Sequence, residues 1–220
     1  MRISLTSEKL EAYVVALLRQ HFPDGYEPNQ PLGPLMASAL ARVEYCFGRI
    51  YLKYYRDGND VLFNHLNGDH FASFLYFLAN SAWQFTGSTE LATRLFYLNK
   101  VMHGIDLFYS VKMPEVFMLV HPLGTVLGHA QYGNHLVIYQ NVTVGADEAG
   151  IYPSFGDGTV LYSKSSVVGE CIFGDDVVVG ANAFVLNTNI PGGSLVVGQF
   201  PNHLIKPQAF TVRKRVFCKN

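Results

Sequence analysis

The sequence predicts an α+β fold, with an N-terminal α-helical domain over residues 1–104, a parallel β-helix of about five coils over residues 105–206, and a C-terminal tail over residues 207–220. Two periodicities predict this fold. Apolar residues recur at helical spacing in the first hundred residues and at six-residue spacing after Asp106. The composition agrees, because 49% of the 220 residues are apolar and only 15% are charged, so the chain can bury a sizeable core.

The composition also narrows the possible functions. A formal net charge of −1 without blocks of like charge disfavours a dedicated nucleic-acid binder, which needs a basic stripe. Cys46, Cys171 and Cys218 lie far apart without CxxC spacing, which indicates neither a disulfide framework nor a zinc site and fits a reducing compartment. No apolar run of 18 residues could span a membrane, so we expect a cytoplasmic protein. Low charge with 14% aromatic residues indicates surface buried against other subunits.

Helical periodicity defines the N-terminal domain. Apolar residues at 3.6-residue spacing predict helices over residues 6–21, about 35–55, 71–85 and about 89–103. Residues 23–34, rich in Pro, Gly and Asn, are expected to form a loop. The segment 71–85 is apolar on nearly every side and is therefore expected to be deeply packed. Ser88 is the expected N-cap of the last helix.

The second half of the chain has a six-residue period. Large, mostly apolar residues occupy every sixth position, with one slip of register at 147–153: Phe108, Pro114, Val120, Val126, Tyr132, Ile138 and Val144, then Phe155, Leu161, Val167, Phe173, Val179, Val185, Pro191 and Val197. After the slip of register, mostly small residues lie four positions beyond these large residues. This pattern predicts a β-helix in which each hexad forms one face of a triangular prism, with the large residue pointing inward. Three hexads complete a coil, and coils stack at about 4.8 Å. An ordinary β-sandwich would need the spacing to be accidental.

Several motifs in this half match one known family. The stretch IDLFYSVKMPEVFMLVH at Ile105–His121 aligns without gaps with the segment that opens the family's β-helix, and HPLGTVLG follows at His121–Gly128. The stretches VIYQNVTVGA, YPSFGDGTVLYSKSSVVG, VVGANAFVLN and VVGQFPNHLIK match its later coils and its C-terminal acetyl-CoA motif. In these motifs the chain resembles the hexapeptide-repeat acyltransferases, and among them the serine acetyltransferases, over about Asn67–Lys206.

The resemblance implies a left-handed β-helix and a homotrimer, which could pair into a hexamer as a dimer of trimers. It implies acetyl-CoA as a co-substrate bound between neighbouring prisms. It also implies direct acetyl transfer to a hydroxyl, which needs a general base, and histidine has a suitable pKa of about 6.5. By the alignment, His121 is that base and Asp106 its carboxylate partner, close to one coil apart. The alternatives are a structural histidine and a carboxylate that caps the junction between the helices and the β-helix.

The chain departs from the family pattern at positions that hold the acceptor. Val120 replaces an acidic residue that binds serine in the family, and Tyr152 replaces a second histidine. Asp57 is only a loose candidate for a further acidic substrate residue. Because an ammonium group without a partner charge is expensive to bury, these changes favour an acceptor that lacks the amine, such as a sugar hydroxyl. Tyr152 could orient that hydroxyl or stabilise the thioester oxyanion.

The resemblance also assigns positions to acetyl-CoA. Ser163 and Ala181, the latter beside Gly180, correspond to backbone contacts of the pantetheine arm. Gly198 belongs to the C-terminal motif, in which Lys206 could meet a phosphate. The alternative is that the small residues serve the corners of the prism and that Lys206 is ordinary surface.

A metal site is not expected. His129 and His135 occupy the same place in successive hexads, so they project from different faces of one prism and cannot share a metal within a subunit. A γ-class carbonic anhydrase, which is also a left-handed β-helix, spaces its histidines differently. His129 or His135 could instead contact CoA or the acceptor across an interface.

The sequence thus predicts an acetyl-CoA-dependent O-acetyltransferase, serine acetyltransferase-like, that acts on a hydroxyl of a surface polysaccharide or its precursor. One alternative is a genuine serine O-acetyltransferase of cysteine biosynthesis. Another is a non-catalytic β-helix scaffold. The predicted site comprises His121, Asp106 and Tyr152 for catalysis and Asp57, Val120 and His129 for the acceptor.

Overall fold

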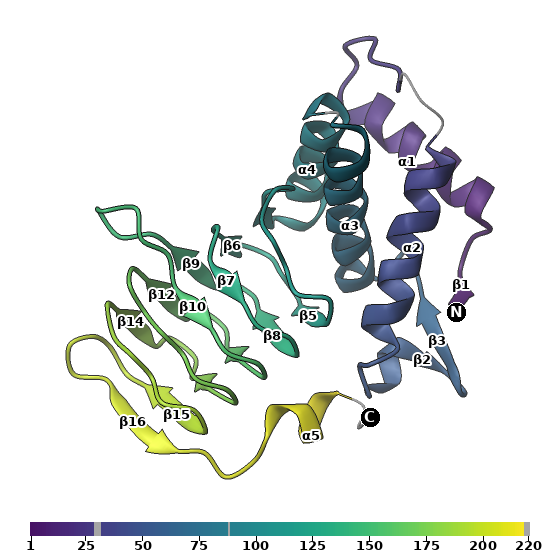
Figure 1. Ribbon diagram of the computed structural model, residues 1–220. Coiled ribbons are helices and arrows are strands. Elements are labelled where there is room, and N and C mark those ends of the chain that lie inside the picture. Colours follow the sequence, from purple (N-terminus) through teal and green to yellow (C-terminus); the bar gives the residue numbers. More distant parts are fainter. Residues whose placement is uncertain (29–31, 88, 218–220) are drawn as a thin grey trace.

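The computed structural model describes residues 1–28, 32–87 and 89–217. Helices at one end of the molecule stand against the first coil of a parallel β-helix, so the predicted fold class is confirmed (Figure 1). The helices are α1 (Ser7–His21), α2 (Gly33–Phe47), α3 (Gly68–Thr86) and α4 (Thr89–His103). No helix within the described residues is long and apolar enough to cross a bilayer. Ser88 and Cys218, which the sequence analysis singled out, lie outside the described residues.

The helix predicted over residues 35–55 is shorter than expected. It ends at Phe47, where the backbone N–H of Gly48 donates to the carbonyl of Glu44 and the chain turns. The next residues form the short helix η1 (Lys53–Tyr55) and a small sheet of β1 (Arg2–Ile3), β2 (Arg56–Asp57) and β3 (Asp60–Phe63). Glycine is a poor helix former, and the aromatic run after it favours extended backbone.

Helix α3 is packed as deeply as predicted, since every residue from His70 to Ala82 is buried. The Asn67 side chain caps its N-terminus by accepting from the backbone N–H groups of Asp69 and His70. The helix packs against the first coil, where the Tyr76 hydroxyl donates to the carbonyl of Val111 at 2.6 Å.

The β-helix has three faces, and each face is named after the strand that comes first in it along the chain. The β5 face contains β5 (Phe117–Val120), β8 (Leu136–Tyr139), β11 (Val160–Leu161), β13 (Val178–Val179) and β15 (Ser194–Val197). The β4 face contains β4 (Asp106–Leu107), β6 (Val126–Leu127), β9 (Thr143–Gly145), β12 (Ser166–Val168) and β14 (Phe184–Leu186). The β7 face contains β7 (Gln131–Tyr132) and β10 (Ser154–Phe155) and is continued by single bridges. Each face is parallel, with each strand in register with its neighbours.

The predicted hexad register is correct in the middle of the β-helix and shifted by one residue at both ends. In the first coils Leu119 and Leu127 are buried, whereas Val120 is only half-buried and Val126 is exposed. The cause is the corner between β5 and β6, which is two residues longer than the next corner along. At the far end Val196 is fully buried in place of Val197.

The three corners of the prism are distinct. The His121 corner joins the β5 face to the β4 face, and in its successive coils His121, Asn141, Lys164 and Asn182 all have left-handed backbone, with φ between 49° and 61°. The His129 corner joins the β4 face to the β7 face and includes the loop at 146–153. The His135 corner joins the β7 face back to the β5 face.

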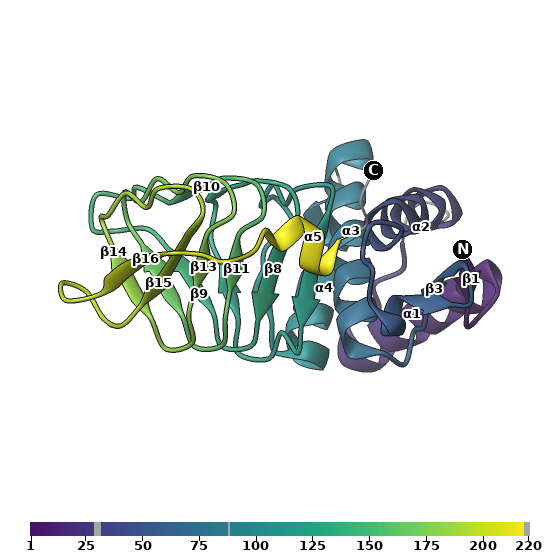
Figure 2. The same ribbon diagram turned by 90° about the horizontal axis from the view of Figure 1, so that it is seen from below.

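The C-terminal tail returns across the β5 face. Strand β16 (Leu204–Pro207) pairs antiparallel with β15, and the chain then runs over the strands to the short helix α5 (Val212–Val216) beside the helices (Figure 2). Val137, Val160 and Val178 alternate with the inward-facing residues of this face, yet all three are buried. Their burial is explained by the tail that lies over them.

Candidate active site

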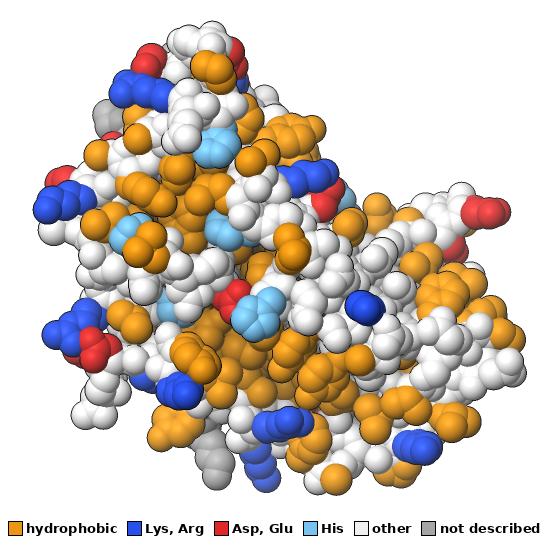
Figure 3. Space-filling view, turned by 180° about the vertical axis from the view of Figure 1, so that it is seen from behind, with side chains coloured by type: hydrophobic (Ala, Val, Ile, Leu, Met, Phe, Trp, Pro, Cys, Tyr) orange, Lys and Arg blue, Asp and Glu red, His pale blue; other side chains and the backbone are white. Residues whose placement is uncertain are grey.

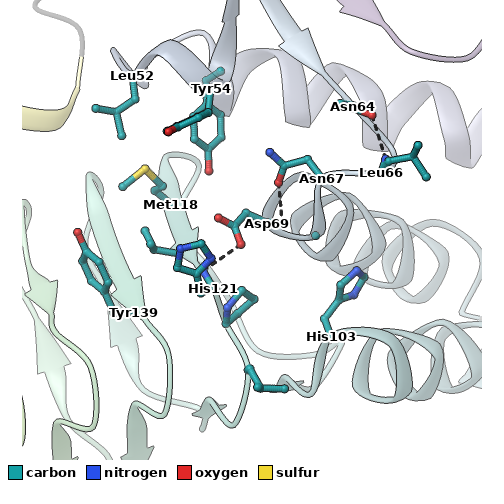
Figure 4. Close-up of a pocket in the computed structure, with 15 residues that line it drawn as sticks. Leu52, Tyr54, Asn64, Leu66, Asn67, Asp69, His103, Met118, His121 and Tyr139 are labelled. Carbon is teal, nitrogen blue, oxygen red and sulfur yellow. Dashed lines mark hydrogen bonds between the residues drawn. The ribbon is translucent and has the colours of Figure 1, made fainter.

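A cavity of about 820 Å³ lies where the helices meet the His121 corner. Figure 3 shows hydrophobic side chains gathered in a hollow between the two parts, with histidine and acidic side chains near it. The cavity is lined by Leu52, Tyr54, Tyr55, Asn64, Leu66, Asn67, Gly68, Asp69, His103, Met118, Val120, His121, Pro122, Leu123 and Tyr139. Two residues of the predicted site, His121 and Val120, are therefore brought together in one cavity (Figure 4).

His121 follows strand β5 at the start of its corner. Its side chain is exposed, and its backbone is left-handed with φ of 49°. The backbone N–H of His121 donates to Oδ1 of Asp69 at 2.9 Å. This hydrogen bond ties the corner that presents His121 to the N-terminus of α3.

Asp69 is a site residue that sequence reasoning missed. It is half-buried in the first turn of α3, and Figure 4 shows it beside His121. Burial raises the pKa of Asp69, while the N–H and the charge of His121 oppose that rise. The sequence signal was an Asn-Gly-Asp start to an apolar helix, which indicates only a helix N-terminus. Nothing in the spacing places that terminus beside His121.

His103, at the end of α4, is the second missed residue. Its Nδ1 lies 2.8 Å from Oδ1 of Asn99, and burial lowers the pKa of His103 to about 4. His103 is therefore neutral at pH 7 and can contribute to the cavity only as an uncharged imidazole.

Asp106, the predicted partner of His121, lies on β4 next to β6. Its Oδ2 forms an ion pair with Nζ of Lys100 on α4 at 2.6 Å, and its backbone N–H donates to the carbonyl of Thr125. The carboxylate that is hydrogen-bonded to His121 in this structure is that of Asp69. The dyad of His121 with Asp106 stays a prediction.

The other acceptor candidates lie elsewhere on the molecule. Asp57 is exposed on β2 and forms an ion pair with Arg2. Tyr152 lies in the loop of the His129 corner, with its ring 6.3 Å from the ring of His129, and His129 Nε2 lies 2.9 Å from the Ser110 hydroxyl. His135 belongs to a different corner and packs edge-on against Phe217 at 5.1 Å.

The positions assigned to acetyl-CoA follow the His121 corner from coil to coil. The backbone N–H of Asn182 donates to the carbonyl of Ser163, so Ser163 and Ala181 lie in stacked coils. Gly198 lies in the coil that follows Ala181, and its backbone is left-handed with φ of 91°. Lys206 is exposed on β16. Within the described residues no group of three or more side chains gathers that could hold a metal ion.

Comparisons with known proteins agree with this arrangement. No family model matches the chain. A serine acetyltransferase of Staphylococcus xylosus is 28% identical over 134 residues, which is 59% of this chain and 61% of that protein. The serine acetyltransferase of Staphylococcus aureus strain Mu50 is 29% identical over 121 residues, 53% of this chain and 56% of that protein. The matches thus span about three-fifths of the length of these relatives.

Solved structures cover nearly the whole chain. A serine acetyltransferase of Vibrio cholerae superposes with a TM-score of 0.69 at 21% identity, covering 93% of this chain and 82% of that one. The serine acetyltransferase of Neisseria gonorrhoeae in complex with serine gives 0.63 at 22% identity, covering 90% and 91%. The chain therefore has the fold of the solved serine acetyltransferases, and the sequence of its coils is similar to that of the Staphylococcus serine acetyltransferases.

Proposed function

We propose that the chain is an acetyl-CoA-dependent O-acetyltransferase and that its acceptor is L-serine. The observation that carries the proposal is the cavity in which Asp69 faces the exposed His121. The preference for a sugar hydroxyl rested on the missing carboxylate at Val120. Asp69 supplies a carboxylate to the same cavity from another element, and the relatives in sequence and in structure are serine acetyltransferases. These observations favour L-serine over a saccharide.

In the proposed reaction, His121 accepts the proton of the serine hydroxyl as the oxygen attacks the thioester carbonyl of acetyl-CoA. The tetrahedral intermediate then collapses, the carbon–sulfur bond breaks, and the imidazolium returns its proton to the departing thiolate. The products are O-acetylserine and CoA. No covalent bond to the protein forms. Asp106 is proposed to favour the imidazolium electrostatically, an effect that its ion-pair partner Lys100 reduces.

We place acetyl-CoA along the His121 corner, where Ser163, Gly180, Ala181 and Gly198 leave room beside the backbone. A Cβ on Gly180 would lie 3.0 Å from Val197 Cγ1 and 3.2 Å from the carbonyl oxygen of Val196, so a larger residue here would have to push the next coil aside. Lys206 would meet a phosphate of the nucleotide.

We further propose a homotrimer, with or without pairing into a hexamer, in the cytoplasm. Tyr152 and His129 lie at another corner from His121, so they would reach a His121 cavity only on a neighbouring subunit. The free thiols of Cys46 and Cys171 are compatible with a reducing compartment, where thiols stay unpaired.

The test is release of free thiol from acetyl-CoA with L-serine and, separately, with a panel of nucleotide sugars. We expect turnover with L-serine and a fall in kcat of about 100- to 10,000-fold in His121→Ala. His21→Ala, in α1, is the matched control and should keep full activity. Turnover with sugars alone would contradict the serine acceptor, and no turnover with any acceptor would favour a scaffold.

A further inference from the structure

We propose that Asp69 recognises the ammonium group of the acceptor and so makes the site specific for a 2-amino acid over its amine-free analogue. The inference rests on the proposed function and goes beyond it by assigning the specificity to one side chain. That side chain comes from α3. The position next to the catalytic histidine, which carries a carboxylate in the family, is occupied by Val120 here.

The first argument is charge. Of the cavity-lining residues that the structure describes, Asp69 is the only Asp, Glu, Lys or Arg. A carboxylate in a mostly apolar cavity without a Lys or Arg side chain is only partly balanced in charge, and a cationic ligand would complete the balance. A neutral sugar hydroxyl does not supply that charge, and neither does the uncharged acetyl thioester of acetyl-CoA.

The second argument is the free oxygen of the carboxylate. Oδ1 of Asp69 accepts from the backbone N–H of His121. Within the described parts of the chain, the hydrogen bonds to this carboxylate use Oδ1 alone, so Oδ2 remains for another donor. An ammonium group donates strongly to such an oxygen.

The third argument is position. The carboxylate is bonded to the residue that carries the proposed base, so a ligand on Asp69 lies close to His121. In L-serine only two carbons separate the ammonium nitrogen from the hydroxyl oxygen. An ammonium held by Asp69 therefore brings the hydroxyl toward the His121 side chain, which is the alignment that acetyl transfer requires.

A purely structural role for Asp69 is the competing explanation. An acidic residue in the first turn of a helix interacts favourably with the helix dipole, and here it also holds the left-handed backbone of His121. Asp69→Asn separates the two roles, because asparagine keeps an oxygen that can accept from the His121 N–H but loses the charge. Asp69→Glu keeps the charge.

The experiment measures kcat and KM for L-serine and for 3-hydroxypropanoate, which is serine without its amine. In Asp69→Asn we expect KM for L-serine to rise about 10- to 100-fold, the range of a hydrogen bond to a charged group. KM for acetyl-CoA and kcat/KM for 3-hydroxypropanoate should stay unchanged. Asp69→Glu should keep a preference for L-serine. Asp60→Asn, an exposed aspartate on β3, is the matched control and should behave as the wild type.

Two results would overturn the inference, and they are distinguishable. If the wild type acetylates L-serine and Asp69→Asn loses both acceptors equally, or keeps its preference, Asp69 has only a structural role and the proposed function stands. If the wild type does not acetylate L-serine, the proposed function fails and the inference fails with it. Thermal melting of each variant confirms that it is folded.

Discussion

At the scale of single residues, the ionised carboxylate of Asp69 opposes folding. Burial raises the pKa of Asp69 above its value in the unfolded chain, so the folded state accommodates the protonated form better. Above the folded-state pKa the residue is therefore destabilising, and below the unfolded-state pKa it is not. A group that reduces stability and yet is placed in a cavity is a candidate for function.

We expect Asp69→Asn to raise the melting temperature at pH 8, because it removes a charge that burial disfavours. The gain should disappear as the pH falls through the folded-state pKa, since wild-type Asp69 is then protonated as well. Melting curves of both proteins between pH 8 and pH 4 test this. A variant that melts lower than the wild type at pH 8 would contradict it, and Asp60→Asn should show no such pH dependence.

The residues that line the cavity show how much of the candidate site the sequence could predict. His121 and Val120, which line the cavity, could be singled out because they fall within a gapless motif. Asp69 and His103 were missed because their closeness to His121 comes from the docking of α3 and α4 on the first coil, which no spacing rule describes. The ion pair of Asp106 with Lys100 has the same origin.

At the scale of elements, the repeat itself was predictable and its exceptions were not. Six-residue spacing follows from the geometry of a flat face and a corner, so the middle coils obey it. The corner after β5, which forms part of the cavity, breaks the register because it is two residues longer than the next corner, and the sequence carries no separate mark of this insertion. The end of α2 was similarly misjudged, since apolar residues continue past Gly48 in a different structure.

Two glycines at strand ends, Gly156 directly after β10 and Gly145 at the end of β9, provide a test of coil stacking. A Cβ on Gly156 would lie 2.6 Å from backbone atoms of Gly174 in the next coil, whereas one on Gly145 would meet nothing closer than 3.9 Å. We expect Gly156→Ala to destabilise the protein by about 1–3 kcal/mol, as overpacking does, and Gly145→Ala to change stability little. Urea unfolding measures both. Equal effects would mean that the coils can separate locally without loss.

At the scale of the whole molecule, the tail connects the last coil of the β-helix to the helical part of the chain. Phe217 is 2% exposed and bridges to Ile50, and the N–H of Tyr51 donates to the carbonyl of Val216 at 2.8 Å. The next residues, Leu52, Tyr54 and Tyr55, line the cavity. The tail therefore supports one wall of the site. The low charge of the chain fits this construction, because so much of each part is covered by another.

Removing the anchor of the tail should weaken the whole molecule. We expect Phe217→Ala to reduce the free energy of unfolding by about 3 kcal/mol, the usual loss for a buried phenylalanine. Phe210→Ala is the control, since Phe210 is 40% exposed on the same tail and should lose at most about 1 kcal/mol. Denaturant titration compares them, and equal losses would show that the tail is held along its length instead of at its end.

Strand β16 has a consequence for how copies of the protein meet. A parallel β-helix is a stack with open ends, and each end presents unpaired backbone groups onto which another stack could add and grow into a fibre. At one end the helices cover the first coil. At the other, β16 reverses direction across β15 and finishes in Pro207, which has no N–H to donate. On the β5 face the last coil thus ends in a strand of opposite polarity, which does not match the parallel pairing by which another stack would add to this edge.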